Sequence, residues 1–188
     1  MKLKLGIIAI LALLATLAAC SSTKPLQSAA QVDIERFGGE WYVIANIPYF
    51  MERNRVASKT IYERTGPTTF NDIFVSKRGS FDAQSKRVAG KLKSISDDHT
   101  QWQARFYWVL NSQFSVLDID PEHQIMLLGV ASRELGWVFA REPKISAADY
   151  AKAMATFAEF GYDTSLFSKV PQFPEQLGQP GFQEIEQN

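Results

Sequence analysis

The sequence predicts an all-β domain: an eight-stranded antiparallel up-and-down barrel with one C-terminal α-helix packed outside it. Three observations predict this fold. Eight short segments rich in β-branched and aromatic residues follow one another, turn-forming residues separate them, and the apolar residues after the eighth segment change to helical spacing. This pattern occupies about 140 residues, the size of one domain that buries a core without disulfides.

The eight expected strands are short, and consecutive strands are expected to be neighbours in the barrel. We place them at residues 41–47, 56–63, 70–76, 87–95, 101–108, 113–119, 124–130 and 136–141. A possible helical turn at residues 33–39 precedes the first strand. Turn-forming residues separate the strands in Thr65-Gly66-Pro67, Lys77-Arg78-Gly79, Ser96-Asp97-Asp98 and Asp120-Pro121-Glu122.

Alternation of side chains within the strands predicts a hollow interior. In the strand expected at 87–95, Lys91 and Lys93 face solvent, so Val88 and Leu92 face inward. Small residues on the inward faces leave space that a solid core would fill; they are Ala45, Ser58, Gly90 and Ala104. The pattern suits a barrel that encloses one small ligand, and the alternative is a filled barrel or sandwich whose inner polar groups pair with one another.

One helix is expected after the strands, over about residues 146–160. Ser146 with Asp149 three positions later resembles a capping box in which aspartate replaces the usual glutamate, and Gly161 can end the helix. Four apolar residues follow helical spacing: Tyr150, Met154, Phe157 and Phe160.

The N-terminus has the layout of a secretory signal peptide over residues 1–19. Lys2 and Lys4 precede an apolar run that is shorter than a membrane span. Leu17-Ala18-Ala19-Cys20 resembles the lipobox of bacterial lipoproteins, which implies that Cys20 is lipidated and that three acyl chains hold the mature protein to a membrane. By analogy with lipoprotein sorting, Ser21 favours the outer membrane, on its periplasmic face. The alternative is an ordinary cleaved signal with an incidental cysteine.

The remaining segments divide the mature chain into a tether, a barrel and a tail. Residues 20–32 contain the lipidated cysteine and a small, polar stretch expected to be a flexible tether. The barrel domain is expected at 33–170, and the Pro- and Gly-containing tail at 171–188 is interpreted as a second linker.

Charge and cysteine content exclude several functions. Without the leader the chain has 18 Lys and Arg against 20 Asp and Glu, a net charge of −2, so we expect no nucleic-acid partner. Cys20 is the only cysteine, which leaves the folded part without a disulfide or a cysteine nucleophile.

Two sequence motifs resemble the lipocalin family. Gly39-Glu40-Trp41-Tyr42 matches its glycine-x-tryptophan signature, and Arg141 ends the last expected strand. In that family the arginine covers the tryptophan at the closed end of the barrel, a role the resemblance assigns to Gly39, Trp41 and Arg141. Within about residues 33–170, segments such as Asp33-Ile34-Glu35-Arg36-Phe37 and Pro143-Lys144-Ile145-Ser146 resemble the bacterial outer-membrane lipocalins related to apolipoprotein D, from whose pattern His123 and Lys77 depart.

We find no convergent set of catalytic groups, so we predict a binding protein rather than an enzyme, with no cofactor and no metal site. His99 and His123 lie in predicted turns and are interpreted as solvated. No nucleophile elbow or phosphate-binding glycine loop is present in the sequence, and Asp97-Asp98 is typical of a turn rather than of a catalytic carboxylate pair.

The expected interior is apolar with a few polar groups, which suits an acyl chain. Alternation predicts eight ligand-lining residues: Val43, Ala45, Thr60, Tyr62, Phe106, Phe114, Val116 and Phe139. The segment at 48–55 would lie at the open end in this family's fold. Arg53 or Arg55 would there meet an anionic head group, unless both are merely solvated.

Three functions follow in order of preference. The first is a membrane-anchored protein that binds fatty acids or lysophospholipids for storage, scavenging or transport in the cell envelope. The second is an interaction module with an incidental cavity, and the third is an enzyme acting on a lipid-like substrate. The sequence leaves a homodimer open.

Overall fold

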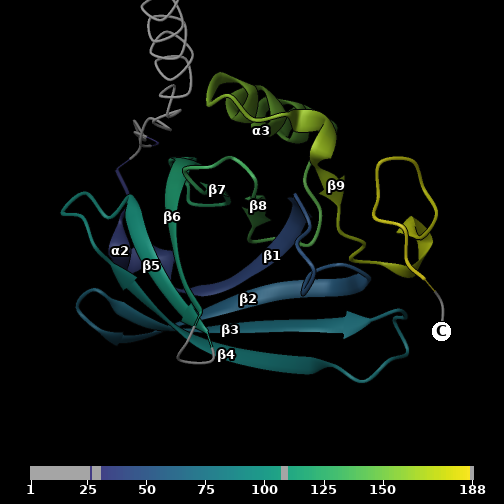
Figure 1. Ribbon diagram of the computed structural model, residues 1–188, viewed down its shortest axis with the longest axis horizontal. Coiled ribbons are helices and arrows are strands. Elements are labelled where there is room, and N and C mark those ends of the chain that lie inside the picture. Colours follow the sequence, from purple (N-terminus) through teal and green to yellow (C-terminus); the bar gives the residue numbers. More distant parts are fainter. Residues whose placement is uncertain (1–25, 27–30, 107–109, 187–188) are drawn as a thin grey trace, which may run out of the picture.

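The computed structural model describes residues 26, 31–106 and 110–186 as a closed barrel with a helix outside it (Figure 1). This arrangement confirms the predicted fold class. The barrel strands are β1 (Gly39–Asn46), β2 (Arg55–Gly66), β3 (Thr69–Arg78), β4 (Lys86–Ser94), β5 (Gln101–Phe106), β6 (Leu110–Ile119), β7 (Ile125–Gly129) and β8 (Gly136–Ala140).

The strands pair in chain order, and β1 closes the barrel by pairing with both β8 and β2. All these pairs are antiparallel. The N-terminal half of β1 pairs with β2, Gly39 opposite Tyr62, whereas its C-terminal half pairs only with β8 among the barrel strands. A gap therefore remains on the other side of Ala45 and Asn46.

Two helices flank the barrel. The short α2 (Ile34–Phe37) has Asp33 as its N-cap, whose Oδ1 accepts a hydrogen bond from the amide of Glu35 at 3.0 Å. The long α3 (Ala147–Glu159) begins after Ser146, whose Oγ accepts a hydrogen bond from the amide of Asp149 at 3.0 Å. The capping residue and the extent of the predicted helix are therefore confirmed.

Apolar side chains form two cores, one inside the barrel and one outside it. The inner core contains Trp41, Phe37 and Trp102 and fills the closed end. The outer core lies between the barrel wall and α3, where Phe157 is fully buried. Because the wall separates the two cores, the direction of each β1 side chain decides which core it joins.

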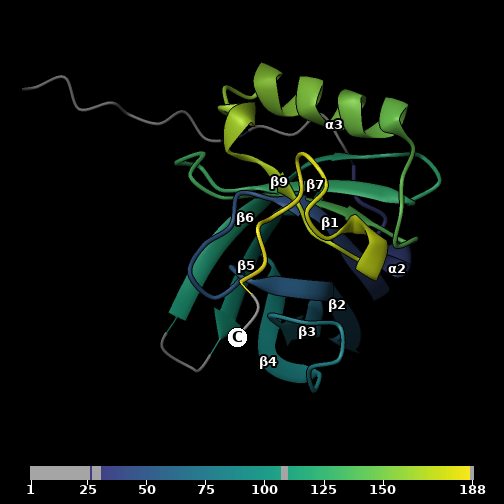
Figure 2. The same cartoon turned by 90° about the vertical axis from the view of Figure 1, so that its right-hand side faces the viewer.

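Residues 171–186 are not a linker, which corrects the interpretation of the tail. After η2 (Thr164–Leu166), β9 (Ser168–Lys169) pairs with Ala45 and Asn46 and fills the gap beside β1. The chain continues through η3 (Pro174–Gln176) and then returns to lie beside β9, where Phe182 forms a parallel bridge with Lys169 (Figure 2). The carboxamide of Gln172 bridges β1 and β2 by donating to the carbonyl of Val43 at 2.8 Å and to that of Ser58 at 3.1 Å.

The predicted signal peptide and Cys20 lie outside the described residues. The C-terminal end of the expected tether is fixed to the barrel, since Val32 is buried and its amide donates to the carbonyl of Asp98 at 3.3 Å. Within the described part of the chain, no helix is both long enough and apolar enough to cross a bilayer.

Candidate functional site

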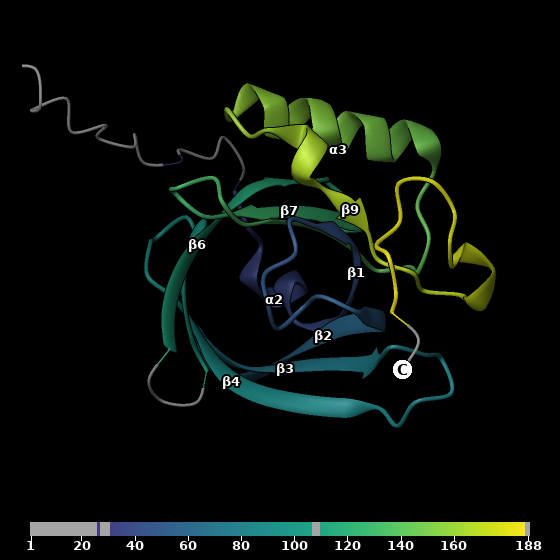
Figure 3. The same cartoon turned by 45° about the vertical axis from the view of Figure 1, so that its right-hand side comes forward.

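A cavity of about 490 Å³ occupies the half of the barrel opposite α2. Figure 3 looks obliquely into this end, with the loop at 47–54 crossing the opening and α2 behind it at the far end. Aromatic rings form much of the wall, contributed by Tyr62, Phe74, Phe106, Phe114, Trp137 and Phe139. Such a cavity has the size and character of small-molecule sites in proteins.

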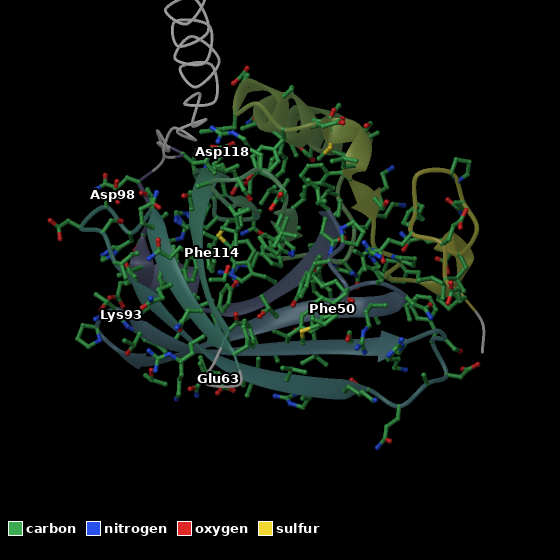
Figure 4. All side chains as sticks on the ribbon, in the orientation of Figure 1. Phe50, Glu63, Lys93, Asp98, Phe114 and Asp118 are labelled. Carbon is green, nitrogen blue, oxygen red and sulfur yellow. The ribbon has the colours of Figure 1, made fainter. Side chains whose placement is uncertain are left out.

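The structure places six of the eight predicted lining residues at this cavity. They are Val43, Thr60, Tyr62, Phe106, Phe114 and Phe139. Figure 4 labels Phe114 within the barrel. Ala45 and Val116 do not line the cavity, and their predicted contact with a ligand is corrected on that ground.

Ala45 faces the outer core because β1 is irregular. The pairing of β1 with β8 shifts between Val43 and Ala45, which inserts one residue into the alternation. Ala45 is therefore fully buried under α3, while Val43 points into the barrel. Strict alternation cannot reveal such a bulge, so the prediction from the sequence assigned Ala45 to the inner face of β1, which is wrong.

Val116 faces inward but lies too deep to reach the cavity. It is fully buried in the inner core. Its amide donates to the carbonyl of Thr100 at 2.8 Å, next to the closed-end tryptophan Trp102. Alternation predicts the face of a strand but not the depth at which a cavity ends.

Two cationic side chains border the cavity, and only one of them was predicted. Arg55, at the start of β2, lines it together with Lys86, at the start of β4. Arg53 does not line the cavity; its Nε donates to the carbonyl of Pro48 at 3.4 Å. Lys77 donates instead to the carbonyl of Phe81 and is not part of the wall.

The closed end has the geometry that the sequence motifs predicted. Trp41 is fully buried, and the guanidinium carbon of Arg141 lies 3.6 Å from the centre of its ring. Arg141 also donates to the carbonyl of Glu40 at 2.8 Å and to that of Arg36 at 2.6 Å. Gly39 has a φ of +94°, and a Cβ there would lie 3.1 Å from Arg141, so glycine is favoured on both counts.

An aromatic plug that the sequence did not predict completes this end. Phe37 projects from α2 between Trp102 and Tyr62, with ring centroids 4.2 Å and 5.0 Å away and nearly parallel planes. Phe70 meets Phe37 edge to face. Because Tyr62 also lines the cavity, this plug is the cavity's floor.

Two buried carboxyl groups in the cavity wall were also missed. Glu52, in the loop across the opening, accepts hydrogen bonds from Asn46 Nδ2 and Trp137 Nε1, both at 2.8 Å. Burial raises its pKa to about 7, against the effect of those donors. Asp72, on β3, accepts a hydrogen bond from the Thr60 hydroxyl, and burial raises its pKa to about 6. Asp72 could have been found by alternation, since it shares a face with Phe70 and Phe74.

The two histidines differ in their surroundings. His99 lies in a turn, 2.9 Å from the hydroxyl of Ser94. His123 is buried, which corrects its interpretation as a solvated residue. Its turn is held by Arg36, which donates to the carbonyl of Pro121, and by Arg141, which donates to that of His123. Within residues 31–106 and 110–186, no group of three or more metal-ligating side chains is close enough to hold an ion.

A comparison with protein families agrees with this geometry. The family model of the lipocalin-like domain matches residues 32–172, three quarters of the chain. The chain belongs to the lipocalin family. This confirms the family predicted from Gly39, Trp41 and Arg141, and the match reaches Gln172, which joins β1 to β2 in this lipocalin.

Known relatives and solved structures extend the likeness. The lipocalin is 27% identical to temperature-induced lipocalin-1 of Arabidopsis thaliana, over 79% of this chain and 84% of the plant protein. Insecticyanin of the tobacco hornworm Manduca sexta has a TM-score of 0.60 at 15% identity, covering 87% of this chain and 90% of insecticyanin. Lobster apocrustacyanin has a TM-score of 0.62 at 15% identity, covering 76% and 81% of the two chains. At these identities the solved structures show a shared fold alone.

Proposed function

We propose that this lipocalin binds a single-chain lipid, a fatty acid or a lysophospholipid, and stores, scavenges or transports it in the cell envelope. The lipocalin fold favours binding and transport of small ligands rather than catalysis. The observation that favours a lipid is the combination of an apolar cavity with two cations, Arg55 and Lys86, in its wall. An acyl chain is stabilised by aromatic and aliphatic walls, and an anionic head by a guanidinium or ammonium group.

Filling the cavity should remove lipid binding at little cost in stability. Ala104 lines the cavity and is paired with Ser112 across β5 and β6. We expect Ala104→Trp to weaken displacement of a fluorescent fatty acid about tenfold or more, because the indole occupies space that the acyl chain needs. The thermal unfolding midpoint of the delipidated protein should change little, since the new ring fills a void.

Ala45→Trp is the matched control. The same substitution in the packed outer core forces displaced side chains and should cost about 1–3 kcal/mol of stability, with fatty-acid binding by the folded fraction unchanged. If Ala104→Trp binds the fluorescent fatty acid as tightly as the parent, the lipid does not occupy this cavity and the proposed function fails.

We also propose that Cys20 anchors the lipocalin to the outer membrane by covalent lipidation. Thioether lipidation requires the sulfur atom, so Cys20→Ala should abolish membrane retention completely while leaving the barrel folded. Membrane fractionation after a salt wash measures retention, and circular dichroism of the soluble variant measures folding. A variant that stays in the washed membrane fraction would refute the anchor.

A further inference from the structure

The floor of the cavity has a carboxyl group within a largely apolar wall. Asp72 lies opposite Tyr62 in the pairing of β2 with β3, and Tyr62 stacks on the plug residue Phe37. Asp72 is therefore at the plugged end of the cavity rather than at its opening. It is only 7% exposed, yet it is one of the residues that line the cavity.

Asp72 has hydrogen-bonding capacity that its neighbours leave unused. A carboxylate can accept about four hydrogen bonds, and the Thr60 hydroxyl occupies one position, on Oδ1. On the other side, β4 presents Gly90, which has no side chain. Asp72 belongs to neither of the ion pairs Lys59–Glu40 and Arg64–Glu35, which join described residues.

The other carboxyl group of the cavity differs in this respect. Each oxygen of Glu52 accepts a hydrogen bond from a side chain, Oε1 from Trp137 and Oε2 from Asn46. Asn46 in turn accepts a hydrogen bond from Gln183 of the C-terminal segment at 2.8 Å. Glu52 is thus held in a fixed structural network, whereas Asp72 faces the cavity with one neutral partner.

We propose that Asp72, with Thr60 and Tyr62 beside it, binds the ammonium group of an apolar primary amine that enters the cavity amine-first. The proposal rests on the proposed function, because it requires that the cavity binds an apolar chain. Buried carboxylates in proteins are normally paired with a cation, and an ammonium group would supply the missing one. The aromatic wall above the floor adds cation-binding ring faces, among them Phe74 and Phe106.

This arrangement selects between head groups. A fatty acid inserted head-first brings a second carboxylate to Asp72, which repels it. Inserted tail-first, as the proposed function requires, it directs its own carboxylate towards Arg55 and Lys86 and leaves the hydrogen-bonding capacity of Asp72 unused. An amine of the same length avoids both penalties, and an alcohol of the same length offers one neutral donor.

Three ligands with the same chain test the proposal: dodecylamine, dodecanol and dodecanoate. Each displaces a neutral environment-sensitive dye from the purified full-length protein at about pH 8, where the amine is protonated and Asp72 is ionised. We expect dodecylamine to bind about tenfold more tightly than dodecanol, because a charge-assisted hydrogen bond is roughly twice as strong as a neutral one. Asp72→Asn should reduce this preference to about twofold or less.

Asp118→Asn is the matched control, because Asp118 lies outside the barrel, where it lines a surface pocket together with Lys152 and Ala153 of α3 (Figure 4). It should keep the tenfold preference.

An amine that binds no better than the alcohol in the parent protein overturns the proposal, even if Asp72→Asn fails to fold. A preference that survives Asp72→Asn overturns it as well. If the alcohol and the acid displace the dye without any preference for the amine, only the amine site is refuted. If none of the three displaces it, the proposed lipid-binding function fails too.

Discussion

Replacing Trp41 with alanine is expected to lower the free energy of unfolding by about 3–5 kcal/mol, a large fraction of the roughly 5–15 kcal/mol of a typical domain. Trp41 is fully buried, so its removal leaves a cavity that the barrel cannot collapse to fill. The substitution also removes two polar contacts of the indole. Its Nε1 donates to the carbonyl of Phe37 at 2.9 Å, and its ring faces the Arg141 guanidinium.

Urea unfolding followed by circular dichroism measures this loss. Trp102→Ala should cost as much, because Trp102 is also fully buried and stacks on Phe37. Phe50→Ala is the aromatic control, since Phe50 is 77% exposed and should change stability by about 0.5 kcal/mol or less. A loss below about 1 kcal/mol for Trp41→Ala would contradict the sealed closed end.

The barrel was predictable because its signals are local. Turn residues and alternating side chains lie within a few positions of one another, so eight strands, their order and the helix after them follow from the chain itself. The pair of Trp41 and Arg141 is a long-range contact. It was predictable because the lipocalin motifs mark both ends of the strand series.

Features that depend on departures from regularity were missed. The bulge after Val43 turns Ala45 outward, and nothing in the residue types of β1 announces it. In the sequence Phe37 is one apolar residue in a short turn, although it fills the space between Tyr62 and Trp102. Proline and glycine in the tail predict a linker, whereas hydrogen bonds to distant β1 and β2 backbone fix it.

The buried carboxyl groups lead to a second large effect, a loss of stability as pH rises. Burial raises the pKa of Glu52 from 4.5 to about 7, so the folded protein binds its proton more tightly than the unfolded chain does. The stabilisation from that proton is complete below about pH 4.5 and is lost as pH rises through 7. A shift of this size corresponds to about 3 kcal/mol.

Asp72 acts in the same direction over a slightly lower range. Its pKa is raised from 3.8 to about 6, again because burial disfavours the charge. The negative charge of Asp72 also makes a minor contribution to the raised pKa of Glu52. Asp98 opposes the trend at low pH, since hydrogen bonds from Ser96 and Thr100 lower its pKa. Stability should therefore be greatest at about pH 4–5 and decline towards pH 8.

Thermal unfolding of the parent, Glu52→Gln and Glu52→Gln/Asp72→Asn at about pH 5 and pH 8 tests this expectation. We expect the parent's midpoint to be clearly higher at the lower pH, Glu52→Gln to lose roughly half of the difference, and the double variant to lose most of it. The amide that Glu52→Gln introduces cannot ionise. It also replaces one acceptor of the hydrogen-bond network with a donor, which changes the unfolding midpoint at both pH values. The test therefore compares how much each protein's midpoint changes between the two pH values. A Glu52→Gln slope equal to the parent's would mean that Glu52 does not titrate between the two pH values, and the loop across the opening would then be held by a carboxylate that stays charged throughout.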